Sequence, residues 1–418
     1  MKPTSTDQPN AGRRNRFRDI FDPDSARSPR ARWVRRFVLL GAAVAILFLL
    51  YTLYQGLYYG DDIPTGRELV RRAFEAGSKL SWNKVRGILT SERFYQQLPG
   101  RLRVLLFVGV MFSVLAAAAF ILFAGVVTRL FGWKPKDTGW TRLLLGLRRF
   151  ILGLAALGAL CILYGFNVEP HWLEVTHVRL ASPKFPAGSR PFRLVLFGDT
   201  HMTRVAGLEE RLPDLIAAEK PDAILFAGDS MNSSWALARF KRLQVRLSQI
   251  APTFTVKGNW DGGYWQDKDI FGKTGVHELT GDAVKLTKTA GTEVWLAGAP
   301  AFDRQAIGPA LQALADRPQA YTVFLYHMPD EADEVARNKV DLFCTAHTHG
   351  GQIALPFYGA LITYSKFDKR FERGLFRVDH TWMYVNRGIG LARWPQPRAR
   401  FFARPELTVI EIGPESTD

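Results

Sequence analysis

Three long apolar runs fill the first two-fifths of the 418-residue chain. Residues 37–59, 104–127 and 150–166 contain no charged side chain. A helix needs about 20 apolar residues to cross the roughly 30 Å of bilayer hydrocarbon, with a lower bound near 17. The runs therefore predict about three transmembrane helices, and buried core helices are the alternative for each. The first run is too long for a cleavable signal peptide, so we expect it to remain as an anchor.

From about Glu169 the pattern changes to short apolar runs that alternate with amphipathic stretches. The apolar runs predict strands at Phe192–Phe197, 223–227, 253–256, 293–297, 322–326, Leu342–Thr345, 382–385 and 407–412. Helical spacing predicts helices at 205–218, 234–250, Ile307–Ala315 and 331–339. Repetition of strand, helix and strand favours right-handed crossovers and a layered α/β body.

The net charge of +16 lies almost entirely in the first part of the chain. Residues 1–166 carry 25 Lys and Arg against 10 Asp and Glu, whereas residues 167–418 carry 30 against 29. The second part therefore lacks the positive field that recruits nucleic acid, and we expect no nucleic-acid partner. The two cysteines, Cys161 and Cys344, lie far apart, which excludes a disulfide framework or a thiolate metal cluster.

These patterns divide the chain into a basic, disordered cytoplasmic tail (1–33), a membrane region (34–166) and an α/β domain (167–418). Positively charged tails stay in the cytoplasm, so three crossings would place the α/β domain on the outer side. The loop at 128–149 is basic, as expected for the inner side, but the loop at 60–103 is basic as well. If one run does not cross the membrane, the predicted side inverts.

Polar side chains follow five of the predicted strands directly. Four of the eight histidines of the chain are among them, in the segments Asp199-Thr200-His201, Gly228-Asp229, Gly258-Asn259-Trp260-Asp261, His327 and His347-Thr348-His349. Ligands bind beyond the carboxyl ends of the strands in open α/β sheets. We therefore expect these residues to meet at one edge, although they span some 150 positions.

Seven of these side chains are candidate metal ligands: Asp199, His201, Asp229, Asn259, His327, His347 and His349. Carboxylate, amide and imidazole groups suit Mn, Fe, Zn or a similar divalent ion. Seven ligands exceed the need of one four-coordinate ion and suit two ions about 3.5–4 Å apart. A single Gly-Asp or Asp-x-His is usually an ordinary turn, but five such motifs in this order favour a dinuclear metal site.

The set D-x-H, G-D, G-N-x-D, H and H-T-H-G-G-Q resembles the calcineurin-like metallophosphoesterase superfamily, and more narrowly its membrane-anchored bacterial branch. The segments 383–390 (MYVNRGIG) and 405–407 (PEL) are similar to that branch as well. The resemblance extends over about residues 175–412. It implies an α-β-β-α sandwich, in which two mixed sheets pack between layers of helices.

The resemblance also implies a role for each residue. Asp199, His201 and His349 would hold the first ion, Asp229 would bridge both ions, and Asn259, His327 and His347 would hold the second. Asn259, Asp261 and His327 are the predicted catalytic residues. The implied reaction is hydrolysis of a phosphate ester or phosphoanhydride by a metal-activated hydroxide.

Three positions depart from the family's pattern. The family often has a leaving-group His after the Gly-Asn pair, and here Trp260 stands instead, with no proton to give at neutral pH. Asp261, which would orient that His, is retained. The other two departures are Ala346 in place of a Gly and Ser230-Met231-Asn232 in place of an apolar residue and an acid. Because general acid catalysis contributes about 10²–10⁴-fold, Trp260 favours a phosphoanhydride or an activated ester as the substrate.

We therefore predict a dinuclear-metal phosphoesterase anchored in the lipid bilayer of a bacterial inner membrane, with an extracytoplasmic catalytic domain. Its substrate would be a phosphorylated small molecule or lipid. The alternatives are a catalytically weakened metal-binding module with the same fold and a membrane scaffold built on residues 1–166. A late basic cluster could bind lipid headgroups or a substrate phosphate, or form a solvated face: Arg387, Arg393, Arg398, Arg400 and Arg404.

Overall fold

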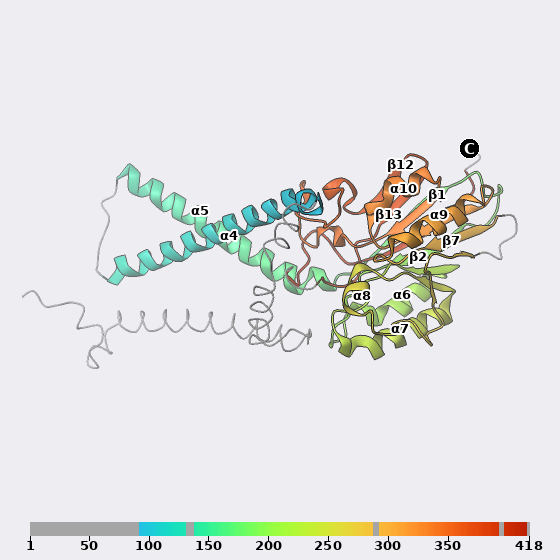
Figure 1. The fold of residues 1–418 in the computed structure, drawn as a ribbon. Helices are drawn as coiled ribbons and strands as arrows, with labels where there is room; N and C mark the ends of the chain where they lie inside the picture. The colour runs from blue at the N-terminus through green and yellow to red at the C-terminus, as the bar shows by residue number, and fades with distance from the viewer. Residues whose placement is uncertain (1–91, 131–137, 287–291, 393–396, 416–418) are drawn as a thin grey trace, which may run out of the picture. The chain divides into compact units, whose positions relative to one another are not determined.

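The computed structural model describes residues 92–130, 138–286, 292–392 and 397–415 (Figure 1). The predicted tail and the first apolar run lie outside these residues. Of the described residues, those from 115 to 152 belong to one compact unit, and those before 115 and after 152 belong to the other.

Two long helices precede the sheets, α4 (Glu92–Leu130) and α5 (Gly139–Asn167). Among the described residues, Thr141–His171 is long and apolar enough to cross a membrane, and Ala117–Thr128 is a shorter apolar stretch. The second and third predicted runs are therefore helical, but the described residues contain one full-length membrane-spanning candidate. The predicted set of three spans is not confirmed.

The first of two six-stranded sheets has the order β1 (Glu174–Ala181), β14 (Glu406–Gly413), β2 (Phe192–Phe197), β3 (Ala223–Phe226), β4 (Thr253–Thr255), β5 (His277–Glu278). Strands β2 to β5 run parallel to one another, and β14 is antiparallel to β2. Strand β1 pairs in parallel with β14 along its whole length. The carboxyl ends of β2, β3 and β4 therefore lie at the same edge.

The second sheet has the order β12 (Gly374–Val378), β13 (Thr381–Val385), β9 (Leu342–Thr345), β8 (Tyr321–Leu325), β7 (Val294–Gly298), β6 (Ala283–Lys285). Strands β7, β8, β9 and β13 are parallel, whereas the outer strands β6 and β12 are antiparallel to their neighbours. A small hairpin, β10 (Ala354–Leu355) and β11 (Gly359–Ala360), stands apart from both sheets.

The two sheets pack face to face, because alternate residues of both share one apolar cluster that includes Leu194, Leu225, Val323 and Cys344. The outer face of the first sheet is covered by α6 (Leu212–Glu219) and α7 (Leu237–Ile250), and that of the second by α9 (Ile307–Ala315) and α10 (Ala332–Arg337) (Figure 1). The central strands are buried on both faces, which explains their continuous apolar sequences. These mixed sheets and helix layers agree with the predicted α-β-β-α sandwich.

Each predicted strand is present to within about a residue or two, but several elements were not predicted. Strands β1 and β12 are edge strands with polar or exposed residues, so they lack the apolar run that marks a buried strand. The short helix α8 (Asn259–Tyr264), which was not predicted, begins at the Gly-Asn pair. The helix predicted at 205–218 begins instead at Leu208, after Gly207, as a 3₁₀ turn that leads into α6.

Candidate metal centre

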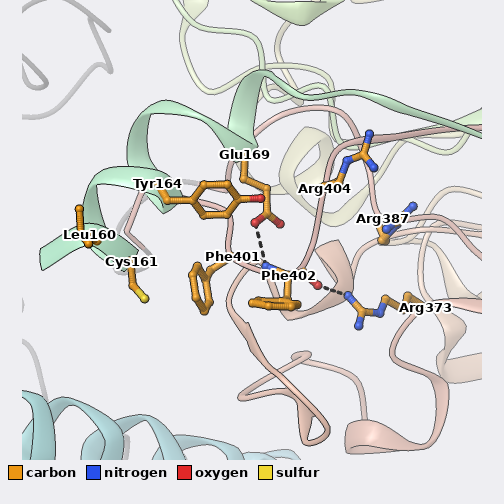
Figure 2. A pocket seen from close by; sticks show the side chains of 9 residues that line it. All are labelled: Leu160, Cys161, Tyr164, Glu169, Arg373, Arg387, Phe401, Phe402 and Arg404. Carbon is orange, nitrogen blue, oxygen red and sulfur yellow. Dashed lines mark hydrogen bonds between the residues drawn. The ribbon is translucent and has the colours of Figure 1, made fainter. Parts of the chain in front are cut away.

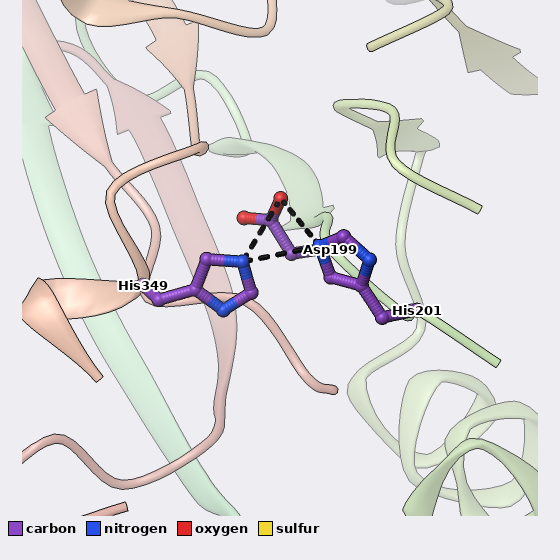
Figure 3. Close-up of side chains that lie close together, drawn as sticks. All are labelled: Asp199, His201 and His349. Atoms are coloured by element: carbon purple, nitrogen blue, oxygen red, sulfur yellow. Dashed lines mark hydrogen bonds and ion pairs between the residues drawn. The ribbon is translucent and has the colours of Figure 1, made fainter. Parts of the chain in front are cut away.

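The first of two groups of side chains that could hold a metal ion consists of Asp199, His201 and His349 (Figure 3). The Nε2 atom of His349 lies 3.6 Å from Oδ1 of Asp199 and 3.2 Å from Nε2 of His201. All three residues are buried. Asp199 and His201 follow β2 and His349 follows β9, so the first sheet contributes two residues and the second sheet one.

The second group consists of Asp229, His327 and His347, which follow β3, β8 and β9. The Nε2 atom of His327 lies 3.2 Å from Oδ2 of Asp229 and 3.2 Å from Nδ1 of His347. Two ring nitrogens and a carboxylate oxygen that lie this close together can bind one divalent cation between them.

The two groups meet at Asp229. Its Oδ2 atom lies 3.2 Å from Nε2 of His327 in the second group and 3.6 Å from Nε2 of His201 in the first. Asp199 also touches both groups, because its Oδ2 accepts the backbone N–H of His347 at 2.9 Å. A carboxylate in this position can reach two neighbouring cations.

Two buried oxygens support a fit between this site and metal ions. Asp199 Oδ1 and Asn259 Oδ1 have no hydrogen-bond partner among the described residues. A buried carboxylate oxygen without a partner costs free energy unless a cation satisfies it. Asn259 is the first residue of α8, and the backbone N–H of the next residue, Trp260, donates to Oδ1 of Asp229 at 2.8 Å. Asn259, the seventh predicted ligand, is therefore next in the chain to a residue that binds Asp229 of the second group.

The turns that carry these side chains are strained. Five of the six grouped residues have a positive φ: Asp199 (49°), His201 (38°), Asp229 (58°), His347 (71°) and His349 (53°). A side-chain-bearing residue in this region costs about 1–2 kcal/mol, and such strain is concentrated at functional sites. The positive φ values belong to the turns after the strands, from which these side chains reach the two groups.

Two glycines allow the turns to approach closely. A Cβ atom on Gly228, whose φ is +94°, would lie 2.4 Å from the backbone nitrogen of Gly258. A Cβ atom on Gly258 would lie 2.1 Å from Oδ1 of Asp229. Glycine before Asp229 and before Asn259 is thus a steric requirement of the site.

Comparison with known proteins agrees with this geometry. Residues 192–351 match the family model of the calcineurin-like phosphoesterases. The chain is 31% identical over 287 residues to the uncharacterized metallophosphoesterase YkuE of Bacillus subtilis, a match that covers 63% of this chain and 96% of YkuE. The chain belongs to the calcineurin-like phosphoesterase family. It is accordingly a metal-dependent hydrolase.

Two further proteins are similar to the chain. The phosphodiesterase YaeI of Escherichia coli is 30% identical over 277 residues, covering 63% of this chain and 98% of YaeI. The UDP-2,3-diacylglucosamine pyrophosphatase LpxG of Chlamydia muridarum is 23% identical over 319 residues, covering 62% of this chain and 95% of LpxG.

Three of the four histidines in the phosphoesterase site are neutral at pH 7, which is the form that binds a metal ion. Burial lowers the pKa of His201 and of His347 to about 4, and the pKa of His349 well below its ordinary value. Burial also disfavours a charged His327, but Asp229 and Asp199 outweigh it and raise its pKa to about 9. Imidazole binds metal in its neutral form, so His327 must release a proton when a cation binds.

Hydrogen bonds from outside the groups orient two of the rings. Nδ1 of His327 donates to the carbonyl oxygen of Ala227 at 2.7 Å, which leaves Nε2 free to bind. Nδ1 of His201 lies 2.9 Å from Oδ1 of Asn232, whose amide in turn donates to the carbonyl of Leu391. The carbonyl contact of the amide nitrogen fixes Oδ1 as the acceptor, so Nδ1 of His201 carries the proton. The positioning role of Asn232 was not predicted, although Asn232 stands in one of the segments that depart from the family's pattern.

Replacing Asn232 with leucine should weaken metal binding about 10–100-fold, because the His201 ring loses the partner that orients it. Activity measured against Mn²⁺ concentration, together with metal content after dialysis, checks this. Asn338→Leu is the matched control, because the side-chain amide of Asn338 donates to the carbonyl of Glu334 in α10 and to none of the candidate metal ligands. Equal metal dependence in the two variants would contradict the assignment.

Asp261, one of the predicted catalytic residues, directs its carboxylate at two neighbouring turns of the chain. Its Oδ2 accepts the backbone N–H groups of Asp229 and Gly258, and its Oδ1 accepts the N–H and the hydroxyl of Ser230. Asp261 is therefore a positioning residue that joins the turn after β3 to the start of α8. The hydroxyl of Ser230, the first residue of the departing segment, is one of its donors.

Trp260 packs at the edge of the first group. Its ring meets that of His201 edge to face with centroids 5.5 Å apart, and lies 4.7 Å from the ring of Tyr264. Its indole N–H is buried and has no hydrogen-bond partner among the described residues. The aromatic ring thus stands beside the site where the family's leaving-group histidine is expected.

Two arginines of the late basic cluster, Arg387 and Arg400, are held inside the fold rather than on a solvated face. Arg400 is fully buried, and its guanidinium donates to the carbonyls of Arg387, Gly388, Gly390 and Ala403. Its guanidinium also lies 3.5 Å from Nδ1 of His349. Arg387 is paired with Glu174 and Glu406 at 2.8 and 3.1 Å. Arg393 lies outside the described residues.

Ala346, which stands where the family has a glycine, fits because its neighbour Gly198 has no side chain. Ala346 is buried, and its methyl group lies 3.0 Å from where a Cβ of Gly198 would stand. The methyl group therefore occupies space that Gly198 leaves open.

Proposed function

We propose that this phosphoesterase is membrane-anchored and that its two metal groups act as one dinuclear centre on a lipid-linked or envelope-borne phosphate. The observation that carries the proposal is the position of Asp229, whose Oδ2 lies within 3.6 Å of a histidine from each group. Two cations held by one carboxylate can act together on a single phosphoryl group.

In this proposal each residue keeps the role that the family resemblance implies. Asp199, His201 and His349 hold one divalent ion, and Asn259, His327 and His347 hold the other. Asp229 binds both ions, and Asp261 holds the Asp229 turn in place through backbone N–H groups. Divalent ions of the Mn, Fe or Zn type, when bound, activate water at neutral pH and neutralise charge on the phosphoryl oxygens.

The substrate class follows from Trp260. An indole cannot protonate a leaving oxygen, so a leaving group that is already a weak base is favoured. A phosphoanhydride meets this condition, because the group that departs is itself a phosphate. The LpxG relatives, which are named as pyrophosphatases of a diacylated sugar nucleotide, support this class.

Membrane anchorage is proposed from the helix that leads into the catalytic domain. The apolar stretch Thr141–His171 ends three residues before β1 begins at Glu174. The catalytic residues would then lie close to a bilayer surface, where lipid-linked substrates are found. With a positively charged cytoplasmic tail and three crossings, the domain would face the outer side of a bacterial inner membrane. Protease treatment of spheroplasts, which reaches only that side, tests the orientation.

The full chain in detergent should contain about two metal ions and should hydrolyse a lipid diphosphate faster than an alkyl phosphomonoester. Metal analysis, followed by phosphate release with Mn²⁺, Zn²⁺ or Mg²⁺, measures both properties. A phosphodiester and single-stranded RNA complete the set of substrates. Faster hydrolysis of RNA or of the alkyl monoester than of the lipid diphosphate would overturn the substrate class.

A further inference from the structure

A cavity of about 680 Å³ lies outside the metal centre, beside the end of α5 (Figure 2). One wall is apolar and comes from Leu160 and Tyr164 of the helix and from Phe401 and Phe402 of the loop before β14. The opposite side carries three arginines, Arg373, Arg387 and Arg404. None of the candidate metal ligands lines it.

The apolar wall is held firmly against the helix end. Glu169 accepts the backbone N–H of Phe402 at 2.9 Å and that of Ala403 at 2.6 Å. The backbone N–H of Arg400 donates to the carbonyl of Gly165 in the last turn of α5 at 2.9 Å. Because these bonds join the loop to the helix, the cavity is formed in the folded chain before any ligand binds, which lowers the entropic cost of binding.

The arginines of the basic side are paired to different degrees, and the carboxylate of Glu169 lines the cavity as well. Arg387 pairs with Glu174 and Glu406, and Arg404 lies 3.8 Å from Glu174. Arg373 donates to the carbonyl oxygen of Phe402 and has no carboxylate within salt-bridge distance among the described residues. Its aliphatic stem lies beside that of Arg387, because a Cβ on Gly350 would be 3.2 and 3.1 Å from the two chains.

The apolar wall and the arginines lie at the end of the helix that could cross a membrane. Leu160 and Tyr164 belong to the last turns of the apolar stretch that could cross a membrane. Leu160 and Phe402 are exposed, with relative exposures of 63% and 50%. An apolar wall at the end of a membrane helix, facing arginines, matches the boundary between acyl chains and phosphate headgroups.

We propose that the cavity binds one anionic phospholipid, with its phosphate at Arg373 and the first part of its acyl chains against Leu160, Phe401 and Phe402. The inference rests on the membrane anchorage proposed above but not on the catalytic role of the metal groups. A lipid bound here would join the catalytic domain to the bilayer surface at a second point besides the helix.

The test is native mass spectrometry of the full chain in detergent, titrated with phosphatidylglycerol or phosphatidylcholine. The wild type should retain one phosphatidylglycerol in preference to phosphatidylcholine. Arg373→Glu should lower this retention about tenfold or more, because it reverses the charge that meets the phosphate. Arg377→Glu is the matched control, since Arg377 on β12 instead stacks on Trp382 at 4.5 Å. It should leave retention unchanged.

A second variant separates a lipid from a free phosphate. Phe402 has a φ of 52°, a conformation that asparagine tolerates well, so Phe402→Asn removes apolar surface without adding backbone strain. It should weaken phosphatidylglycerol retention, and millimolar inorganic phosphate should not displace the lipid from the wild type. Unchanged retention in Arg373→Glu, equal retention of phosphatidylcholine, or full displacement by inorganic phosphate would overturn the proposal.

An activity measurement distinguishes failure of this inference from failure of the proposed function. Arg373→Glu should hydrolyse a soluble aryl phosphate ester at the wild-type rate. If the metal proposal fails, the wild type itself will lack bound metal and activity while lipid retention is unaffected. If only the lipid proposal fails, activity will be intact and the retained lipid will not depend on Arg373.

Discussion

Asp229→Asn is expected to lower the rate of phosphate ester hydrolysis by about 10³-fold or more, although the variant should fold. Its Oδ2 lies close to a histidine of each metal group, 3.2 Å from His327 and 3.6 Å from His201. An amide at this position carries no charge and cannot be shared between two cations. Metal-ion stabilisation of a phosphoryl transition state is worth several kcal/mol, and each 1.36 kcal/mol is tenfold in rate, which gives about this loss.

Asparagine is the informative replacement at this position. It keeps an oxygen to accept the backbone N–H of Trp260, which Oδ1 of Asp229 accepts at 2.8 Å. Alanine would leave that donor buried and unpaired, and a loss of activity could then reflect local unfolding. The measurement is the initial rate with saturating Mn²⁺, together with metal content and thermal unfolding.

The matched control for this carboxylate is Asp214→Asn. Asp214 lies on α6 with its side chain 83% exposed, where it pairs with Arg246 at the surface. Removing an exposed ion pair of this kind changes stability by about 0–1 kcal/mol and should not alter the rate. If Asp229→Asn keeps the wild-type rate while Asp214→Asn behaves as expected, the assignment of the metal centre is wrong.

Trp260→His is expected to increase hydrolysis of an alkyl phosphodiester by about 10²-fold and to change hydrolysis of an aryl phosphodiester much less. The ring at this position lies beside His201, with centroids 5.5 Å apart, and an imidazole there could protonate the departing oxygen. General acid catalysis contributes about 10²–10⁴-fold, and alkoxide leaving groups gain most because they are strong bases. The ratio of the alkyl to the aryl rate is the quantity to measure.

A second variant and the substrate preference of the wild type test whether proton transfer explains the gain. Trp260→Phe removes the indole N–H and keeps an aromatic ring against Tyr264, so a gain seen with Phe as well would reflect packing rather than proton transfer. The wild type should itself favour the aryl substrate strongly. Equal wild-type rates for the aryl and alkyl diesters would refute the idea that the chain lacks a leaving-group acid.

The central strands and the metal-binding side chains could be predicted from the sequence because both depend on local order. Each candidate ligand stands directly after an apolar run, so the strand that positions it is its neighbour in the chain. Strands buried on both faces, such as β2, β3 and β8, have continuous apolar sequences. The parallel arrangement then brings their carboxyl ends to one edge, as a layered α/β pattern requires.

The positioning residues could not be predicted, because their partners are distant in sequence. Asn232 orients His201 from 31 positions away, and Asp261 accepts the N–H of Asp229 from 32 positions away. Arg400 lies in a stretch rich in arginine, and only the fold shows that its charge is buried among backbone carbonyls. The sequence does not distinguish a polar residue that is exposed to water from one that is buried with hydrogen-bond partners inside the fold.

The amino-acid sequence alone determined the order of apolar runs, the uneven charge and the set of metal-binding side chains, since these are properties of neighbouring residues. Only the tertiary structure decided that Asp229 joins the two groups, that Asp261 accepts hydrogen bonds from the turn after β3, and that arginines meet aromatic rings at the end of α5. The physical reason is that packing and hydrogen bonding act through space. Residues far apart in the chain acquire their function from the neighbours that the fold gives them.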